Sequence, residues 1–309
     1  MVSRVSLEQA LALHRSGRLA EAETLYRALL TGEPGNADAQ HFLGVAVLQQ
    51  GRAEEAAALI GKVAKRRKKD PQVLNNLGEA YRALGRWSEA SKCYRRAIAL
   101  NPRDPAPHNN LGNVMTNQGK ATEAAASYRR ALDLAPDDVE VLTNLGAALW
   151  AADRTEEAAA PLERAVALAP GFADAHLALG NLRIAGGDFA AAANSFRQVI
   201  AIEPENVAAL TNLGNVLSDM GELDDAIACH RSVIALDATR AIAHNNLGEA
   251  LQKQGDHDAA VECFERALEI QPDDLGTLIN LGRAHHLQGH LEDAVTLFRR
   301  AVAIAPVSV

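Results

Sequence analysis

The sequence is poor in aromatic residues, in cysteine and in long apolar runs. Aromatic residues make up 4% of the 309 positions, whereas hydrophobic residues as a whole make up 48%. Alanine and leucine therefore supply most of the apolar content, which favours small, closely packed helices over a sheet. No stretch alternates β-branched and polar residues between turn residues, as a strand would. The composition predicts an all-α fold.

Other absences exclude classes of protein. No run approaches the roughly 18 apolar residues of a membrane span, and residues 1–9 contain no apolar signal-peptide core. We therefore expect a cytoplasmic protein that does not contact the membrane. The formal net charge of −8 argues against general nucleic-acid binding. Because Cys93, Cys229 and Cys263 lack metal-binding spacing, we expect them to be reduced and unpaired.

Chemical motifs are missing as well. The sequence has no phosphate-binding glycine loop, no GxSxG elbow and no HExxH helix, so it predicts neither an enzyme nor a cofactor. His285, His286 and His290 surround the turn at Gly289, but no neighbouring carboxylate or cysteine clearly completes a set, and we predict no metal site. The basic run from Lys62 to Lys69 is interpreted either as a solvated helix end or as a docking patch for an acidic partner.

The sequence has an internal repeat instead. A Leu-Gly pair recurs at intervals of 34 residues, beginning with Leu43-Gly44 and ending with Leu281-Gly282. Counting seven residues back from each glycine sets the frame. It predicts one domain, residues 3–308, made of nine repeats: 3–36, 37–70, 71–104, 105–138, 139–172, 173–206, 207–240, 241–274 and 275–308.

Each repeat is predicted to form two helices. The first helix ends at a glycine in repeat position fifteen, replaced by Asp153 in the fifth repeat. The second helix usually ends before a proline, the last of which is Pro306, and an Asp or Asn then caps the next helix. Small alanines recur at position twenty, and large residues such as Tyr94 and Phe264 recur at position twenty-four. This alternation of small and large side chains fills the space between helices.

The pattern resembles the tetratricopeptide repeat family over essentially the whole chain. The matching residues of the third repeat are Leu74, Leu77, Gly78, Tyr81, Gly85, Ala90, Tyr94, Ala97 and Pro102. The resemblance implies a right-handed α-solenoid, or superhelix, in which the first helix of each repeat lines a concave groove. It further implies a protein–protein interaction scaffold that binds a partner protein or an extended peptide in that groove.

Position six of the first helix faces the predicted groove, because positions four, seven, eight and eleven form the opposite, core face. We call its asparagines the asparagine row: Asn76, Asn110, Asn144, Asn212, Asn246 and Asn280. Further candidate peptide-binding residues are Asn75, Asn109 and Asn245 at position five, and Asn113 and Asn215 at position nine. Primary amides can bond the main chain of a ligand without reading its side chains. Inheritance from one ancestral repeat, or bonding of each amide to a neighbouring helix, would also explain the row.

A subtype is suggested by Asn-Asn-Leu-Gly at 75–78, 109–112 and 245–248. These segments resemble repeats of O-linked N-acetylglucosamine transferases, in which an asparagine ladder holds the substrate backbone. The resemblance gives a second hypothesis, the substrate-docking arm of a larger glycosyltransferase or sulfotransferase. Position five lacks the lysine of a carboxylate clamp, so a chaperone-tail receptor is not expected. The apolar stripe of the last helix, from Ala294 to Ile304, predicts self-association through an uncapped C-terminal end.

Overall fold

The computed structural model describes residues 6–304, and all regular structure in that range is helical. The first helices of successive repeats are α1 Leu7–Arg15, α3 Ala37–Gln49, α5 Pro71–Ala83, α7 Pro105–Asn117, α9 Val139–Ala151, α11 Ala173–Ala185, α13 Val207–Met220, α15 Ala241–Gln254 and α17 Leu275–Leu287. The second helices are α2 Leu19–Gly32, α4 Ala53–Arg66, α6 Trp87–Leu100, α8 Ala121–Leu134, α10 Thr155–Leu168, α12 Phe189–Ile202, α14 Leu223–Leu236, α16 His257–Ile270 and α18 Leu291–Ile304. The all-α fold with two helices per repeat is confirmed.

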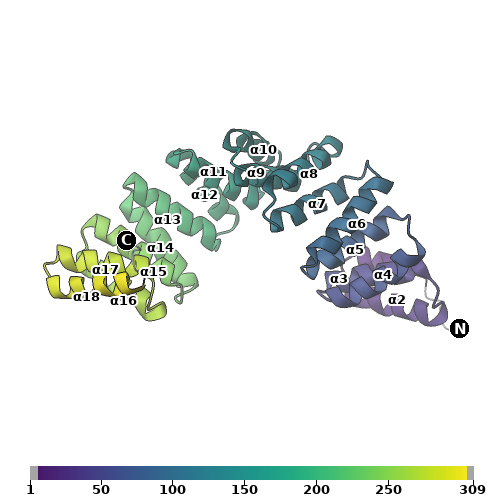
Figure 1. Ribbon diagram of the computed structural model, residues 1–309, viewed down its shortest axis with the longest axis horizontal. Helices are drawn as coiled ribbons and strands as arrows, with labels where there is room; N and C mark the ends of the chain where they lie inside the picture. Colours follow the sequence, from purple (N-terminus) through teal and green to yellow (C-terminus); the bar gives the residue numbers. More distant parts are fainter. Residues whose placement is uncertain (1–5, 305–309) are drawn as a thin grey trace. The chain divides into compact units, whose positions relative to one another are not determined.

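Two compact parts make up the chain, Met1–Pro161 and Leu162–Val309, and the division falls inside α10. Within each part a helix packs against the helices before and after it in the sequence, as the colours of Figure 1 show. This nearest-neighbour packing is that of an α-solenoid. A single domain over 3–308 stays a prediction, and residues 3–5 and 305–308 of that range, with Pro306, lie outside the described residues.

The helix starts follow the predicted caps. At six repeat junctions the predicted Asp or Asn accepts a hydrogen bond from a main-chain N–H in the first turn: Asn36, Asp70, Asp104, Asp138, Asn206 and Asp274. The first repeat differs from expectation. Its helix α1 begins at Leu7, repeat position five, because Ser6 and Gln9 form a capping box there.

The turns between paired helices need a left-handed residue. Eight predicted glycines adopt it, with φ between 68° and 96°. The fifth repeat keeps the same turn without glycine, since Asp153 itself takes φ 60°. Aspartate is one of the few residues that tolerate this conformation, so the turn survives the substitution. Whether Pro161, which lies inside α10, kinks that helix as expected stays a prediction.

The core is built from close contacts between the paired helices. The alanines at position twenty, such as Ala90 and Ala260, are fully buried. A Cβ added to Gly78 would lie 2.5 Å from a ring carbon of Tyr94, and one on Gly248 would lie 2.6 Å from Phe264. The Leu-Gly pair therefore recurs because the large side chain at position twenty-four occupies the space beside the glycine.

Positions three and ten of the first helices are buried too, a second stripe that the helical wheel did not assign. Val73 and Ala80 are examples, both fully buried. The first helix contacts the second helix of its own repeat and that of the preceding repeat, so it needs two apolar stripes rather than one. Among the described residues no helix is long and apolar enough to cross a membrane.

Candidate functional site

The asparagine row lies on the first helices, and all six side chains are half-buried. Asn76, Asn110 and Asn144 belong to α5, α7 and α9 of the N-terminal part. Asn212, Asn246 and Asn280 belong to α13, α15 and α17 of the C-terminal part. In every case the side-chain Nδ2 bonds a side chain of the preceding repeat's first helix.

In the N-terminal part the acceptors are of three kinds. Asn76 bonds His41 Nε2 at 3.0 Å, Asn110 donates to Asn75 Oδ1 at 3.1 Å, and Asn144 donates to Asn113 Oδ1 at 3.5 Å. His41 is buried, and its burial lowers the pKa of the imidazole. A neutral ring has a nitrogen free to accept, which fits its bond with Asn76.

In the C-terminal part the acceptors lie at position nine. Asn212 donates to Asn181 Oδ1 at 2.8 Å, and Asn246 donates to Asn215 Oδ1 at 3.0 Å. Asn280 donates to Glu249 Oε1 at 2.6 Å and to Asn245 Oδ1 at 3.0 Å. The amides thus join α11 to α13, α13 to α15, and α15 to α17.

These bonds show that each amide contacts a neighbouring helix, which was one of the explanations for the row. They use the Nδ2 side of each amide. The six Oδ1 atoms have no hydrogen-bond partner in the described part of the chain, and none of them is among its buried, unpartnered polar atoms. The row therefore presents six solvent-accessible acceptors in fixed positions.

The flanking asparagines have supporting positions. Asn75, Asn113 and Asn215 accept bonds from the row through Oδ1. Asn245 is only 7% exposed and also donates to Glu249 at 2.9 Å. Asn109 is half-buried, and its Oδ1 is buried without a partner. We expect these five side chains to orient the row rather than to make the first contact with a ligand.

Tyrosine hydroxyls also reach position nine in the N-terminal part. Tyr94 donates to Glu79 and Tyr128 donates to Asn113 Oδ1, the latter at 2.7 Å. In the C-terminal part the residues equivalent to these tyrosines are Phe196, His230, Phe264 and Phe298. Asn181, Asn215 and Glu249 consequently have no hydroxyl from the second helix to bond.

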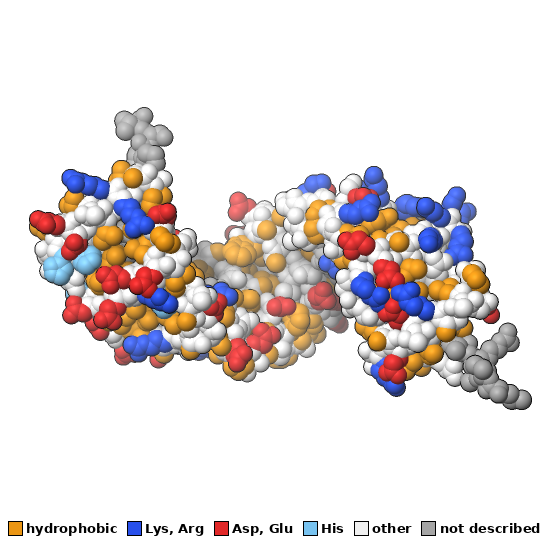
Figure 2. All heavy atoms as spheres, turned by 90° about the horizontal axis from the view of Figure 1, so that it is seen from below, with side chains coloured by type: hydrophobic (Ala, Val, Ile, Leu, Met, Phe, Trp, Pro, Cys, Tyr) orange, Lys and Arg blue, Asp and Glu red, His pale blue; other side chains and the backbone are white. Residues whose placement is uncertain are grey.

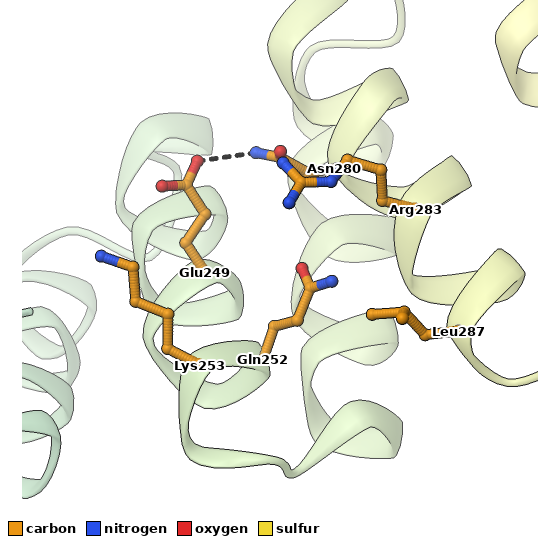
Figure 3. A pocket seen from close by; sticks show the side chains of 6 residues that line it. All are labelled: Glu249, Gln252, Lys253, Asn280, Arg283 and Leu287. Atoms are coloured by element: carbon orange, nitrogen blue, oxygen red, sulfur yellow. Dashed lines mark hydrogen bonds between the residues drawn. The ribbon is translucent and has the colours of Figure 1, made fainter.

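A depression of about 520 Å³ lies on the C-terminal part between α15 and α17 (Figure 3). It is lined by Glu249, Gln252, Lys253, Asn280, Arg283 and Leu287. A second depression of about 240 Å³ adjoins it over α13 and α15 and shares Glu249 and Lys253. There Lys253 Nζ lies 3.1 Å from Asp219 Oδ1 and 3.0 Å from Ser218 Oγ. The row thus borders a polar groove that contains charges of both signs.

Sequence reasoning missed the charged residues of this groove. Glu249 and Arg283 occupy position nine, and Lys253 occupies position thirteen, both of which the helical wheel assigned to the groove face. The signal was available, but attention to the asparagines alone did not use it.

The other surface candidates have mixed outcomes. Figure 2 shows Lys and Arg side chains gathered on the N-terminal part. In the basic run, α4 ends at Arg66, and Arg67 Nη1 lies 2.7 Å from Asp38 Oδ1, so a structural helix end accounts for part of it. The three thiols are free, and burial raises the pKa of each. The expectation that no carboxylate completes the histidine cluster is wrong, because the turn brings Asp293 to His285 and His290.

Models described as tetratricopeptide repeat match residues 13–75, 104–171 and 239–306, and one described as TPR repeat matches 78–119, 180–221 and 214–255. Together these matches leave only short gaps between residues 13 and 306. The chain belongs to the tetratricopeptide repeat family. No curated protein matches the sequence.

Solved tetratricopeptide structures share the fold. YrrB, described as a TPR protein with an unusual peptide-binding site, is 23% identical with a TM-score of 0.54, over 61% of this chain and 97% of that chain. The APC/C hetero-tetramer Cut9–Hcn1 is 17% identical with a TM-score of 0.62, over 86% and 52%. MamA is 27% identical with a TM-score of 0.51, over 55% and 92%. These neighbours support a protein-interaction scaffold.

Proposed function

We propose that this chain is a cytoplasmic scaffold that binds an extended polypeptide along the asparagine row of its C-terminal part. The observation that carries the proposal is the set of open Oδ1 atoms on amides whose Nδ2 sides are already held. A ligand main chain offers N–H donors that such acceptors can bond. Each such bond contributes about 0.5–1.5 kcal/mol net, so several in a row give modest affinity after the ligand is ordered.

The C-terminal part is favoured over the N-terminal part by its groove. The two depressions follow α13, α15 and α17 beside Asn246 and Asn280. In addition, no tyrosine hydroxyl bonds the position-nine side chains there. YrrB, whose printed description includes a peptide-binding site, shows that this fold is compatible with such a role.

The charges of the groove adjust what the ligand looks like. A row of amides alone predicts little dependence on salt. Because Glu249, Lys253 and Arg283 line the groove, we propose that the ligand carries polar or charged side chains on at least one side. Salt should then weaken binding moderately, since exposed charges are screened within about 10 Å at 0.1 M.

The proposal is tested with peptides selected from a random library on the full chain. For each selected peptide, single main-chain N-methyl groups are introduced in turn and compared with alanine substitutions at the same positions. Because the row accepts main-chain N–H groups, methylation at alternate positions should cost more affinity than the alanine substitutions. Peptides whose affinity depends on side chains alone would contradict recognition through the row.

A second candidate function rests on the Asn-Asn-Leu-Gly segments. We propose as the alternative that the chain is the substrate-docking arm of a larger transferase of the O-linked N-acetylglucosamine type. Sequencing of the gene beyond Val309 tests this directly, because the alternative requires a catalytic domain in the same reading frame. Both functions use the same groove, so the N-methyl experiment applies to either.

Self-association through the last helix also stays a proposal. On α18 the side chains of Val295 and Val302 are exposed, whereas Ala294 and Ala301 of the predicted stripe are buried. Light scattering over a range of protein concentrations tests it, and a strict monomer at the highest concentration would remove it.

A further inference from the structure

His285, His290 and Asp293 come together at the turn between α17 and α18. Their ligand atoms, one ring nitrogen from each histidine and one carboxylate oxygen, all lie within 4.8 Å of one another. The two imidazole ring centres are 5.7 Å apart. Figure 2 shows histidine side chains beside acidic ones on the C-terminal part.

The main chain holds this arrangement in place. Gly289 takes the left-handed conformation with φ 82°, and His290 N–H donates to His285 O at 2.9 Å. Ala294 N–H donates to His290 O at 3.1 Å and starts α18. The three Cα positions are therefore fixed by the turn and by the first turn of the helix, before any ion is present.

The same places in other repeats show what has changed here. Position sixteen and position nineteen form Arg–Glu ion pairs in four repeats: Arg18–Glu21, Arg52–Glu55, Arg86–Glu89 and Arg154–Glu157. Position eleven lies beside position sixteen, since Arg86 stacks over the Tyr81 ring at 4.6 Å. The ninth repeat has His290, Asp293 and His285 at these three positions, so three metal-binding side chains replace an ion pair and its packing residue.

These three side chains have no other partner in the described residues. No hydrogen bond or ion pair involves the side chain of His285, His290 or Asp293, and His285 Nδ1 is buried without a partner. A buried polar atom without a partner costs free energy. An ion on the other ring nitrogen does not remove that cost, but it supplies a reason for a histidine at a position where other repeats place Leu or Val.

We propose that His285, His290 and Asp293 bind one divalent transition-metal ion of the zinc class. Two imidazole nitrogens and one carboxylate suit Zn²⁺, Ni²⁺ or Cu²⁺, whereas Mg²⁺ and Ca²⁺ prefer ligand sets made of oxygen. With bonds of about 2.0–2.2 Å, a small rotation of the exposed His290 and Asp293 side chains brings the ligand atoms into range. Water completes the coordination, and the ion links α17 to α18.

The test uses the full chain without a histidine tag. Zn²⁺ is titrated by calorimetry against a competing chelator, and the melting temperature is followed with and without the ion. We expect one equivalent to bind at this site and the melting temperature to rise, because an ion that binds the folded state stabilises it. Mg²⁺ should produce neither effect.

Variants separate this site from adventitious binding. His290→Ala and Asp293→Asn should each lower the zinc affinity by about tenfold or more, since even the loss of an outer hydrogen-bond partner of a ligand costs 10–100-fold. His286→Ala is the matched control, because His286 is exposed, neighbours His285 and lies outside the cluster. Melts without zinc establish that each variant folds. Absence of saturable binding, or equal losses in His286→Ala and His290→Ala, would overturn the proposal.

Discussion

The two parts of the chain use the same row of amides but satisfy it differently. In the C-terminal part the amides of Asn212, Asn246 and Asn280 reach position nine at 2.6–3.0 Å. In the N-terminal part Asn144 reaches Asn113 only at 3.5 Å, and Asn110 bonds position five instead. The difference follows from the second helix, whose Tyr94 and Tyr128 hydroxyls take the position-nine acceptors.

This comparison shows that a substitution on one helix changes the chemistry of another helix's exposed face. A phenylalanine in place of tyrosine leaves packing at position twenty-four nearly unchanged and frees the acceptor at position nine. We infer that the C-terminal part has the more available groove for this reason. The parts differ in acid sensitivity as well. Arg52 is the main cause that lowers the pKa of Glu23 to about 2 in the N-terminal part, whereas the C-terminal part contains the buried imidazole of His230.

The largest expected effect is acid destabilisation of the C-terminal part through His230. Burial lowers the pKa of this side chain from 6.5 to about 4, so the unfolded chain binds the proton first. Stability should fall as pH drops from 6.5 and level off below 4, a loss of about 3 kcal/mol at most. His230→Phe, which restores the ring found at Phe264, should remove that loss.

Hydrogen exchange followed by mass spectrometry between pH 7 and pH 4 resolves the two parts and checks this prediction. The peptides of α13 to α16 should lose protection in the parent and keep it in His230→Phe. The contribution of Glu23 is present above pH 4.5 and is lost only as pH falls toward 2, so α2 to α4 should not respond in this window. Equal loss in both parts would contradict the assignment to His230.

The next effect tests the close contact that both parts share. Gly248→Ala places a Cβ 2.6 Å from the buried Phe264 ring, and Gly78→Ala places one 2.5 Å from Tyr94. Overpacking of this kind costs about 1–3 kcal/mol. Gly276→Ala is the control, because its nearest atom is 3.4 Å away. Urea unfolding followed by circular dichroism measures all three, and a Gly248→Ala protein as stable as the control would show that the ring can move aside.

A smaller effect is expected from the tyrosine hydroxyls. Tyr128→Phe removes the donor to Asn113 at 2.7 Å and should cost about 1 kcal/mol. It also frees Asn113 Oδ1 for Asn144, as in the C-terminal part, which offsets some of the loss. The amide proton shifts of Asn144 in nuclear magnetic resonance spectra report this change. If they do not respond to Tyr128→Phe, the hydroxyl does not control the row.

Much of the fold could be predicted from the sequence because the signals are local and repeated. The cap residues and the left-handed glycines act within one turn of the chain, so Asp70 and Gly85 could be interpreted without their surroundings. The position of Asn246 on an accessible face followed from helical geometry alone. Asp153 shows the limit of such rules, because the turn tolerates a residue that the pattern does not contain.

The rest depends on contacts between repeats, which one helix cannot reveal. The wheel located Asn280 but could not show that Glu249 accepts its proton, since these residues lie on adjacent helices. For the same reason Asp293 was not connected with His285, because the turn geometry decides that approach. The carbonyl side of the amides became the expected ligand contact only once the Nδ2 bonds were known.

The central claim is tested most directly by two triple variants compared on one selected peptide. Asn212, Asn246 and Asn280 are changed to alanine in the first, and Asn76, Asn110 and Asn144 in the second. Each lost amide bond costs about 0.5–1.5 kcal/mol, while alanine recovers up to about 0.7 kcal/mol of helix propensity, so both proteins should fold. By fluorescence anisotropy, the C-terminal variant should bind at least about tenfold more weakly and the N-terminal variant as tightly as the parent. An unchanged dissociation constant for the C-terminal variant would contradict the account.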